Sequence, residues 1–360
     1  MNEVYNFSAG PSCLPKAVLE KAQKDLLDYN ASGMSVMEMS HRSSIYDEIH
    51  NQAAQDLKDL LGVSEDFDLL FLQGGGSSQF SMVPLNLLNP GEKAAYVVTG
   101  SWAKKAFKEA ARFNPVELLA SSEDTGFDHI PEINPSSCPD AKFTYVCTNN
   151  TIYGSRIVPQ KLDPIETPLV ADMSSNILSE VYDMTKFDLV YAGAQKNLGP
   201  AGVTLVLIKK GLKLAQREDL PTMLNYQTHL EKNSLYNTPP CFNIYICGLV
   251  AQWLKDQGGV PAMEERNKEK AKLLYEAIDN SQVFKNKIRP QDRSLMNVTF
   301  VTGDKDLDAK FIAGAKKKGL ENLKGHRSTG GIRASIYNAM PLEGVKALVD
   351  YMKEFELENR

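Results

Sequence analysis

Cysteine is scarce in this chain and occurs in an odd number. The chain has 360 residues and only five cysteines, and no two of them have C-x-x-C spacing. Their positions are Cys13, Cys138, Cys147, Cys241 and Cys247. Disulfide-rich secreted domains and zinc sites use paired, regularly spaced cysteines. The sequence therefore predicts reduced thiols, no metal site and a cytoplasmic location.

An excess of basic charge and a long apolar run are also missing. Lysine and arginine number 40 and aspartate and glutamate 45, so the net charge is −5. This balance argues against a protein that binds nucleic acid through a strongly basic surface. No run approaches the roughly 18 apolar residues that span a bilayer, and residues 1–4 lack the features of a secretory signal. We therefore expect neither a nucleic-acid nor a membrane partner.

What the sequence does contain is a regular alternation between residues 67 and 208. Short apolar runs are followed by small or polar loops and then by helical stretches, which are expected at 77–88 and 102–113. The apolar runs are 69–72, 95–98, 143–146, 169–171, 189–191 and 203–208. This order predicts an α/β fold with a mostly parallel sheet covered on both faces.

The last hundred residues have a different pattern. They predict a smaller α+β domain whose elements are a helix at 262–280, a strand at 296–301, a helix at 305–318, a strand at 331–337 and a helix at 342–357. Gly258, Gly259 and Pro261 are typical of a joint between domains. We therefore expect a large domain at 16–257 and a small domain formed by 1–15 and 258–360, which agrees with the two domains suggested by length.

Ligands of open α/β sheets bind at the carboxyl ends of the strands, so the residues after each apolar run are candidates for a site. Residues 74–78, Gly-Gly-Gly-Ser-Ser, follow a strand and open a helix, and a helix N-terminus binds anions. The loop matches neither the nucleoside triphosphate nor the dinucleotide motif. A phosphate site and a plain strand-to-helix turn both remain open on this evidence.

Three further side chains fall at the same predicted edge. Asp172 ends an apolar strand, so it could pair with a protonated ring nitrogen or cap a helix. Lys196 follows the next strand, so it could form a Schiff base with a carbonyl group or be a surface lysine. Trp102 could stack on a flat ring or belong to the core. Together with the glycine loop, these side chains supply what a pyridoxal phosphate site requires.

The chain closely resembles the phosphoserine aminotransferases, a family of class V aminotransferases with the type I fold of pyridoxal phosphate enzymes. The matching motifs are residues 6–11, 39–43, 74–76, 171–175, 192–197, 325–327 and 330–338. The aspartate and lysine motifs mark the superfamily, whereas the His-Arg pairs and the last motif are specific to this family. The resemblance implies a mixed, mostly parallel seven-stranded sheet in the large domain and a smaller α+β domain.

The resemblance also implies roles at a cofactor site for pyridoxal 5'-phosphate. Lys196 would bind the cofactor covalently and move the proton, Asp172 would keep the pyridine nitrogen protonated, and Trp102 would stack on the ring. The cofactor phosphate would be bound by Gly76, Ser77 and Gln195 and by Asn237 and Thr238 of a neighbouring subunit, with Thr151 near the ring hydroxyl. The site would then lie at a homodimer interface. Ser77 departs from members that carry an arginine there, which affects cofactor affinity.

The substrates implied by the resemblance carry two anionic groups, which arginine forks match well. The substrate-binding residues would be Ser8, His41, Arg42, His326, Arg327 and Arg333. Arg333 would bind the α-carboxylate, and the two His-Arg pairs would bind the distal phosphate, the first pair coming from the partner subunit. From the residues alone, the preferred interpretation of the first pair is an ordinary helix start, and that of Arg327 is a solvated loop charge.

The implied reaction is the reversible transamination of 3-phosphohydroxypyruvate with L-glutamate. Its products are O-phospho-L-serine and 2-oxoglutarate, as in serine biosynthesis, and the phosphohydroxythreonine analogue of pyridoxine biosynthesis is a second substrate candidate. The alternatives are another class V enzyme, such as a serine–glyoxylate aminotransferase or a cysteine desulfurase, and a non-catalytic protein that binds an anionic metabolite.

Overall fold

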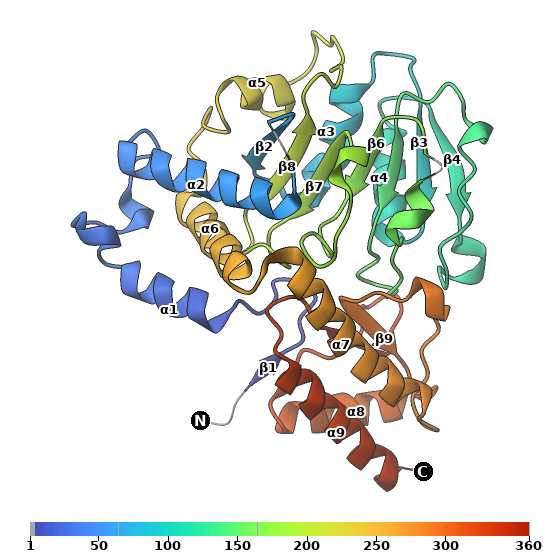
Figure 1. Cartoon of the computed structure of the whole chain (residues 1–360). Coiled ribbons are helices and arrows are strands. Elements are labelled where there is room, and N and C mark those ends of the chain that lie inside the picture. The colour runs from blue at the N-terminus through green and yellow to red at the C-terminus, as the bar shows by residue number, and fades with distance from the viewer. Residues whose placement is uncertain (1–3, 64, 164, 360) are drawn as a thin grey trace.

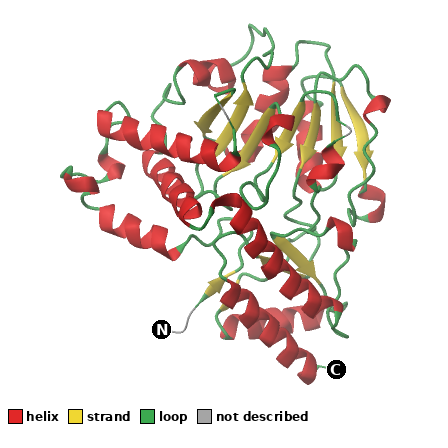
Figure 2. Cartoon of the chain, viewed as in Figure 1, coloured by secondary structure: helices red, strands yellow, loops and turns green. Residues whose placement is uncertain are grey.

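A computed structural model of the chain describes residues 4–63, 65–163 and 165–359, and its centre is a seven-stranded sheet (Figures 1 and 2). The strands are β2 (Phe67–Leu72), β3 (Ala94–Val98), β4 (Val116–Ser121), β5 (Thr144–Cys147), β6 (Leu169–Asp172), β7 (Leu189–Gly193) and β8 (Thr204–Lys209). Their order across the sheet is β2-β8-β7-β6-β5-β3-β4, and only β8 runs antiparallel to its neighbours. The predicted mixed, mostly parallel sheet is confirmed.

Both faces of the sheet are covered, because alternate residues of each strand point to opposite sides. Leu69 and Phe71 belong to a core under α2 (Ser44–Leu61) and α6 (Cys241–Asp256). Leu70 and Leu72 belong to a second core under α3 (Gly75–Leu87), α4 (Ser101–Ala110) and α5 (Tyr226–Glu231). The strands are therefore apolar on both sides, which explains why they appear as continuous apolar runs in the sequence.

Strand β4 is the one strand of the sheet that the apolar runs did not predict. It lies at the edge of the sheet and pairs only with β3. None of its six residues is fully buried, and Leu118 is 55% exposed. An edge strand that is half solvated needs no continuous apolar run, so its sequence carries a weak signal.

The C-terminal part lies below the sheet in the view of Figure 1 and has its own core. Its elements are α7 (Gly259–Asp279), β9 (Asn297–Phe300), α8 (Lys305–Lys317), β10 (Leu320–Glu321), β11 (Ile332–Ser335) and α9 (Leu342–Glu358). Helix α7 begins three residues before the predicted 262, because Pro261 is tolerated in the first helical turn. Strands β9 and β11 are antiparallel.

The N-terminal residues join this C-terminal part. Strand β1 (Tyr5–Asn6) pairs in parallel with β10, and Phe7 is fully buried in the C-terminal core. Helix α1 (Lys16–Asp25) then leads toward α2 and α6 (Figure 1). The division into 16–257 on one side and 1–15 with 258–360 on the other stays a prediction, and residues 1–3 and 360 lie outside the described part.

The sequence led us to expect no membrane partner and reduced thiols. Within the described residues, no helix combines the length and the apolar character needed to cross a bilayer. All five cysteines are free thiols, and four of them are buried.

Candidate active site

A cavity of about 340 Å³ lies at the carboxyl ends of the parallel strands. Nine of the predicted site residues line it: Gly76, Ser77, Trp102, Thr151, Asp172, Gln195, Lys196, His326 and Arg333. Seven of them lie at the end of a strand of the sheet, in a segment that follows one or at the start of the helix after it. His326 lies in the loop before β11. Arg333 lies on β11 of the C-terminal part. The size of the cavity and its mixed polar and apolar lining are typical of a small-molecule site.

Lys196 follows β7 and is held from two sides. Its backbone carbonyl accepts a hydrogen bond from the Ser12 hydroxyl at 2.6 Å, and its Nζ donates to the Thr151 hydroxyl at 2.9 Å. Burial lowers the pKa of the Lys196 amine, and the negative charge of Asp172 opposes this shift. A lysine amine with a lowered pKa is deprotonated, and so nucleophilic, at a lower pH than an exposed one.

Asp172 is the last residue of β6 and is 6% exposed. One carboxylate oxygen, Oδ1, accepts a hydrogen bond from the backbone N–H of Ser174 at 2.8 Å, within a turn rather than at the start of a helix. A Cβ atom at Gly76 would lie 3.9 Å from the other oxygen, Oδ2. A carboxylate this deeply buried favours a cationic partner in the cavity, such as a protonated ring nitrogen.

The glycine loop forms the open N-terminus of α3. Gly74 precedes the helix with φ 90° and Gly75 begins it with φ 65°, both in the left-handed region that glycine tolerates. Within the part of the chain that the structure describes, no side chain caps the helix, and Gly75, Gly76 and Ser77 line the cavity. Free backbone N–H groups and the positive end of the helix dipole therefore face the position of an anion.

Trp102 lies in the first turn of α4 and lines the same cavity. Its indole Nε1 is buried and has no hydrogen-bond partner among the described residues. The Nζ of Lys105 lies 4.3 Å from the centre of the ring system. The tryptophan packs against the edge of a core and also forms part of the cavity wall, which is compatible with the stacking interpretation.

Arg333 adds a positive charge to the cavity wall, and His326 lies in the same wall. Arg333 Nη1 donates to the backbone carbonyl of Thr151 at 3.2 Å, and burial lowers the pKa of its guanidinium. His326 Nδ1 lies 2.7 Å from the Ser328 hydroxyl. Burial lowers the pKa of His326, and the positive charges of Arg333, Arg327 and Lys105 lower it further. This concentration of positive charge suits an anionic substrate.

Six predicted residues are not part of the cavity lining: Ser8, His41, Arg42, Arg327, Asn237 and Thr238. Asn237 Nδ2 donates to the Gln73 side chain at 3.3 Å, at the surface. His41 and Arg42 directly precede the N-cap of α2, Ser43. Four of the six, His41, Arg42, Asn237 and Thr238, were predicted to act in a neighbouring subunit, so their roles stay predictions.

Several lining residues were not assigned from the sequence. They include Ala9, Gly10, Phe80, Asn149, Ser174 and Ser175. Asn149, Ser174 and Ser175 lie just after strands β5 and β6. Their position at the carboxyl ends of these strands was therefore a usable signal for the site. Ala9 and Gly10 reach the site through backbone contacts, such as the bond from Ser12 N to Gln195 O at 2.9 Å. Nothing in the local sequence indicates that contact.

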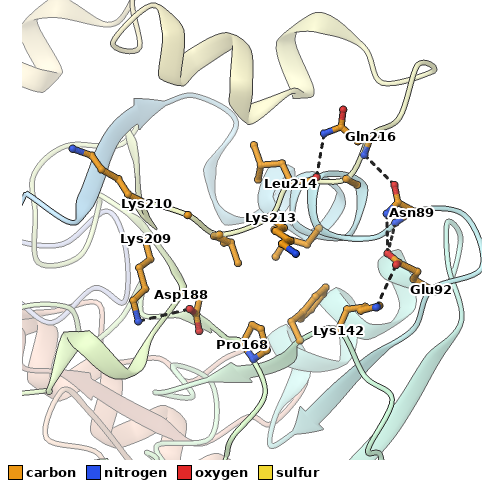
Figure 3. A pocket seen from close by; sticks show the side chains of 15 residues that line it. Asn89, Glu92, Lys142, Pro168, Asp188, Lys209, Lys210, Lys213, Leu214 and Gln216 are labelled. Atoms are coloured by element: carbon orange, nitrogen blue, oxygen red, sulfur yellow. Dashed lines mark hydrogen bonds and ion pairs between the residues drawn. The ribbon is translucent and has the colours of Figure 1, made fainter.

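A larger cavity of about 820 Å³ lies at the opposite end of the sheet (Figure 3). It is lined by residues that precede parallel strands, including Phe143, Pro168 and Asp188. Lysines surround it, but Lys209 lies 3.9 Å from Asp188 and Lys142 lies 3.5 Å from Glu92. The carboxyl ends of the parallel strands do not meet at this larger cavity, so the smaller cavity is the better candidate for an active site.

The fold and the site together define an enzyme with the type I fold of pyridoxal phosphate enzymes. The chain belongs to the class-V aminotransferases, whose family model matches residues 4–348. It is 56% identical to the phosphoserine aminotransferase of Bacillus cereus, over 100% of both chains. The family predicted from the sequence motifs is therefore confirmed.

Solved structures give the same result. One structure of a phosphoserine aminotransferase, studied for radiation damage of its Schiff base, has a TM-score of 0.95 and 46% identity and covers 99% of this chain and 100% of its own. The phosphoserine aminotransferase of Trichomonas vaginalis with bound pyridoxal phosphate has a TM-score of 0.91 and 39% identity, and it covers 98% of this chain and 100% of its own.

Proposed function

We propose that this chain is a pyridoxal phosphate-dependent aminotransferase that interconverts 3-phosphohydroxypyruvate and L-glutamate with O-phospho-L-serine and 2-oxoglutarate. The observation that carries the proposal is the arrangement of Lys196, Asp172 and Arg333 around one cavity. It brings together an amine, a carboxylate and a guanidinium at the end of one sheet. The names of the relatives, phosphoserine aminotransferases, support the same activity and substrates.

The residues of the cavity fit the cofactor. The buried carboxylate of Asp172 suits a protonated pyridine nitrogen, and the open N-terminus of α3 suits a phosphate. Trp102 lines the cavity, so its ring is placed to pack on a flat ligand there. When bound, pyridoxal phosphate supplies the electron sink for breaking the bond between the substrate α-carbon and its hydrogen.

Lys196 moves the proton. Because burial lowers its pKa, the free amine can accept the α-proton and later return a proton to the reacting atoms. Thr151 orients this amine through its hydroxyl at 2.9 Å. Asp172 keeps a positive charge in place on the cofactor ring, so its role is electrostatic.

Arg333 binds the α-carboxylate that all substrates share, because a guanidinium matches a carboxylate with two parallel hydrogen bonds. Thr151 holds one side of that guanidinium through its backbone carbonyl. Arg327 supplies positive charge for the distal phosphate or the γ-carboxylate of glutamate, and His326, which lines the cavity, donates a hydrogen bond to the same group. Ser8 is proposed to contact the substrate from the N-terminal side.

The working unit is a homodimer in which each site takes residues from both chains. His41 with Arg42, and Asn237 with Thr238, lie outside the cavity of their own chain, so they are available to a neighbouring one. Exposed apolar side chains gather in the N-terminal segment around α1: Leu19, Leu27, Met34 and Met37 are between 39% and 85% exposed. A second subunit would cover such a patch.

The cysteine desulfurase alternative is disfavoured by the state of the thiols. A desulfurase requires a reactive thiolate, and burial raises the pKa of every cysteine, including Cys147 in the cavity wall. A protein that only binds an anionic metabolite has no need for Lys196 beside a buried carboxylate. Neither alternative explains the whole set of groups.

The test is the visible absorption of the purified protein with added O-phospho-L-serine. We expect the yellow band of the bound cofactor to bleach and to return when 2-oxoglutarate is added. A yellow protein that ignores O-phospho-L-serine would refute the assigned substrate. A protein that stays colourless with added pyridoxal phosphate would refute the cofactor as well. The same assay with the phosphohydroxythreonine analogue measures the second substrate candidate.

A further inference from the structure

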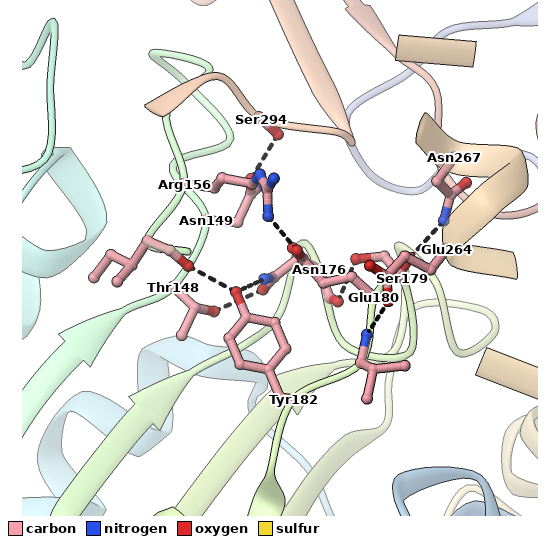
Figure 4. A network of polar contacts seen from close by, with 12 residues as sticks. Thr148, Asn149, Arg156, Asn176, Ser179, Glu180, Tyr182, Glu264, Asn267 and Ser294 are labelled. Carbon is pink, nitrogen blue, oxygen red and sulfur yellow. Dashed lines mark hydrogen bonds and ion pairs between the residues drawn. The ribbon is translucent and has the colours of Figure 1, made fainter. Parts of the chain in front are cut away.

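Buried asparagines surround the active site. Six such side chains are at most 6% exposed: Asn149, Asn176, Asn197, Asn267, Asn297 and Asn338. Five of them join the segments after the sheet strands to the C-terminal part of the chain, and Asn176 is hydrogen-bonded to Thr148 and Tyr182 beside them. Figure 4 shows Asn149, Asn176 and Asn267. An asparagine amide does not titrate, and burying it is costly unless it is hydrogen-bonded. Such a network is suited to hold a fixed geometry.

Asn149 is the centre of the link on the cofactor side. Its Nδ2 donates to the Ser175 hydroxyl at 2.7 Å and to Asn297 Oδ1 at 2.8 Å. Its Oδ1 accepts from the Ser294 hydroxyl at 2.6 Å. Asn149 and Ser175 both line the cavity, and Ser175 lies three residues after Asp172. The contacts of Asn149 therefore fix the loop that follows Asp172.

Asn297 continues the link on the substrate side. Its Nδ2 donates to the Ser335 hydroxyl at 2.9 Å and to the Tyr337 hydroxyl at 3.1 Å. Asn297 and Ser335 are register partners in the antiparallel pair of β9 and β11. Arg333 precedes Ser335 by two residues, so both side chains point to the same face of the strand. The contacts of Asn297 therefore fix the strand that carries Arg333.

We propose that Asn297 is a positioning residue that, through Asn149, sets the place of Arg333 relative to Asp172 and Lys196. This inference rests on the proposed function, because it takes Arg333 as the ligand of the α-carboxylate. A carboxylate that is anchored at the wrong distance moves the α-carbon away from the amine. Small errors of this kind cost much of the rate, since catalysis depends on alignment of the reacting groups.

The test uses the holoenzyme of the variant Asn297→Ala. The measurements are kcat and KM for L-glutamate and O-phospho-L-serine, the inhibition constants of maleate and inorganic phosphate, the cofactor content and the midpoint of thermal unfolding. Maleate has carboxylates but no amino group, and inorganic phosphate has no carboxylate. We expect KM and the maleate constant to rise about tenfold or more, while the phosphate constant and the cofactor content stay unchanged.

Asn86→Ala is the matched control. Asn86 is 1% exposed and also makes three side-chain contacts, to Met82 O, to Leu224 O and from the Tyr226 N–H, but it lies near the C-terminal end of α3. We expect this variant to unfold at a lower temperature with an unchanged ratio of maleate to phosphate constants. Asn297→Ala with the same pattern as Asn86→Ala would overturn the proposal.

Two further variants secure the result. In Asn149→Ala/Asn297→Ala, the rise in KM should be close to that of the more severe single variant, because the proposal makes Asn297 act through Asn149. A fully multiplied rise would overturn the link between them. If Asn297→Ala does not fold, Asn297→Ser serves instead, since a serine is too short to reach Asn149. Should the wild type bind maleate but not turn over O-phospho-L-serine, the assigned substrate fails while the maleate comparison still tests the position of Arg333.

Discussion

The amine nitrogen of Lys196 lies 2.9 Å from the hydroxyl oxygen of Thr151, and this contact connects the reactive amine to the substrate end of the cavity. The backbone carbonyl of Thr151 accepts a hydrogen bond from Arg333 at 3.2 Å. One residue thus orients the group that moves the proton with its side chain and the group that binds the carboxylate with its backbone. The two functions are separable by mutation.

Thr151→Val removes the hydroxyl and keeps the shape and the backbone carbonyl. We expect kcat to fall about tenfold with KM within about twofold, because the amine loses its orientation while Arg333 keeps its contact. Steady-state kinetics with L-glutamate measure both values. Thr151→Ser restores the hydroxyl and should recover most of the rate. A large rise in KM with unchanged kcat would contradict this separation.

Lys196→Ala should remove covalent attachment of the cofactor and reduce turnover by several orders of magnitude. Borohydride reduction followed by peptide mass analysis shows which residue carries the cofactor mass. The control is Lys209→Ala, a lysine at the other end of the sheet, which should behave as the wild type. Cofactor mass on a lysine other than Lys196 would refute its assignment.

The pH dependence of cofactor capture reports the pKa of Lys196 in the apoprotein. Only the neutral amine reacts, and burial lowers its pKa from the ordinary 10.5, so the rate should reach its plateau at a lower pH than an exposed lysine would. The charge of Asp172 raises this pKa, so Asp172→Asn should move the midpoint to still lower pH. Stopped-flow absorbance measures the midpoint. Asp219→Asn, a change at an exposed acid, is the control, and an upward shift in Asp172→Asn would contradict the electrostatic argument.

Trp102 should report cofactor binding by fluorescence. The chain has two tryptophans, so Trp253→Phe leaves Trp102 as the single emitter. We expect its emission to be quenched as the apoprotein binds pyridoxal phosphate, since the ring lines the cavity. Trp102→Ala should weaken cofactor binding about tenfold and Trp102→Phe less, because phenylalanine keeps a flat ring. Unquenched emission from Trp102 would place the cofactor elsewhere.

Mixing two inactive variants tests the shared site. One chain carries His41→Ala and Arg42→Ala, and the other carries Lys196→Ala. If each site combines both chains, random mixing places one intact site in half of the dimers and restores about one quarter of the wild-type activity. The assay is turnover of O-phospho-L-serine after the mixture has been unfolded and refolded. Absence of any recovery, with mixed dimers shown by native mass analysis, would place both sets of residues in the same chain.

Much of the fold follows from the sequence because its strands are buried on both faces. The six apolar runs became strands of the sheet, and the helices of the C-terminal part begin and end close to the expected residues. Strand β4 escaped prediction because half of it faces solvent. The start of α7 moved because a proline fits the first turn of a helix as well as it fits a joint.

The site was predictable to the extent that each residue lies next to a recognisable local pattern. Asp172 and Lys196 directly follow apolar strands, so their convergence follows from sheet topology. The contact between Asn149 and Asn297 joins residues 148 positions apart. The local sequence around either residue does not indicate that the other is its partner. Long-range polar pairing of this kind depends on how the two parts of the chain dock.

The parallel pairing of β1 with β10 has a consequence for folding during synthesis on the ribosome. Tyr5 is made early, but β1 cannot pair with β10 until Leu320 has been made. Ala9 and Gly10, which close one side of the cavity, follow directly on that strand. The N-terminal residues, which are synthesised early, are thus among the last to take their place in the fold. A chain released before β10 has been made leaves the ribosome with one side of its cavity open.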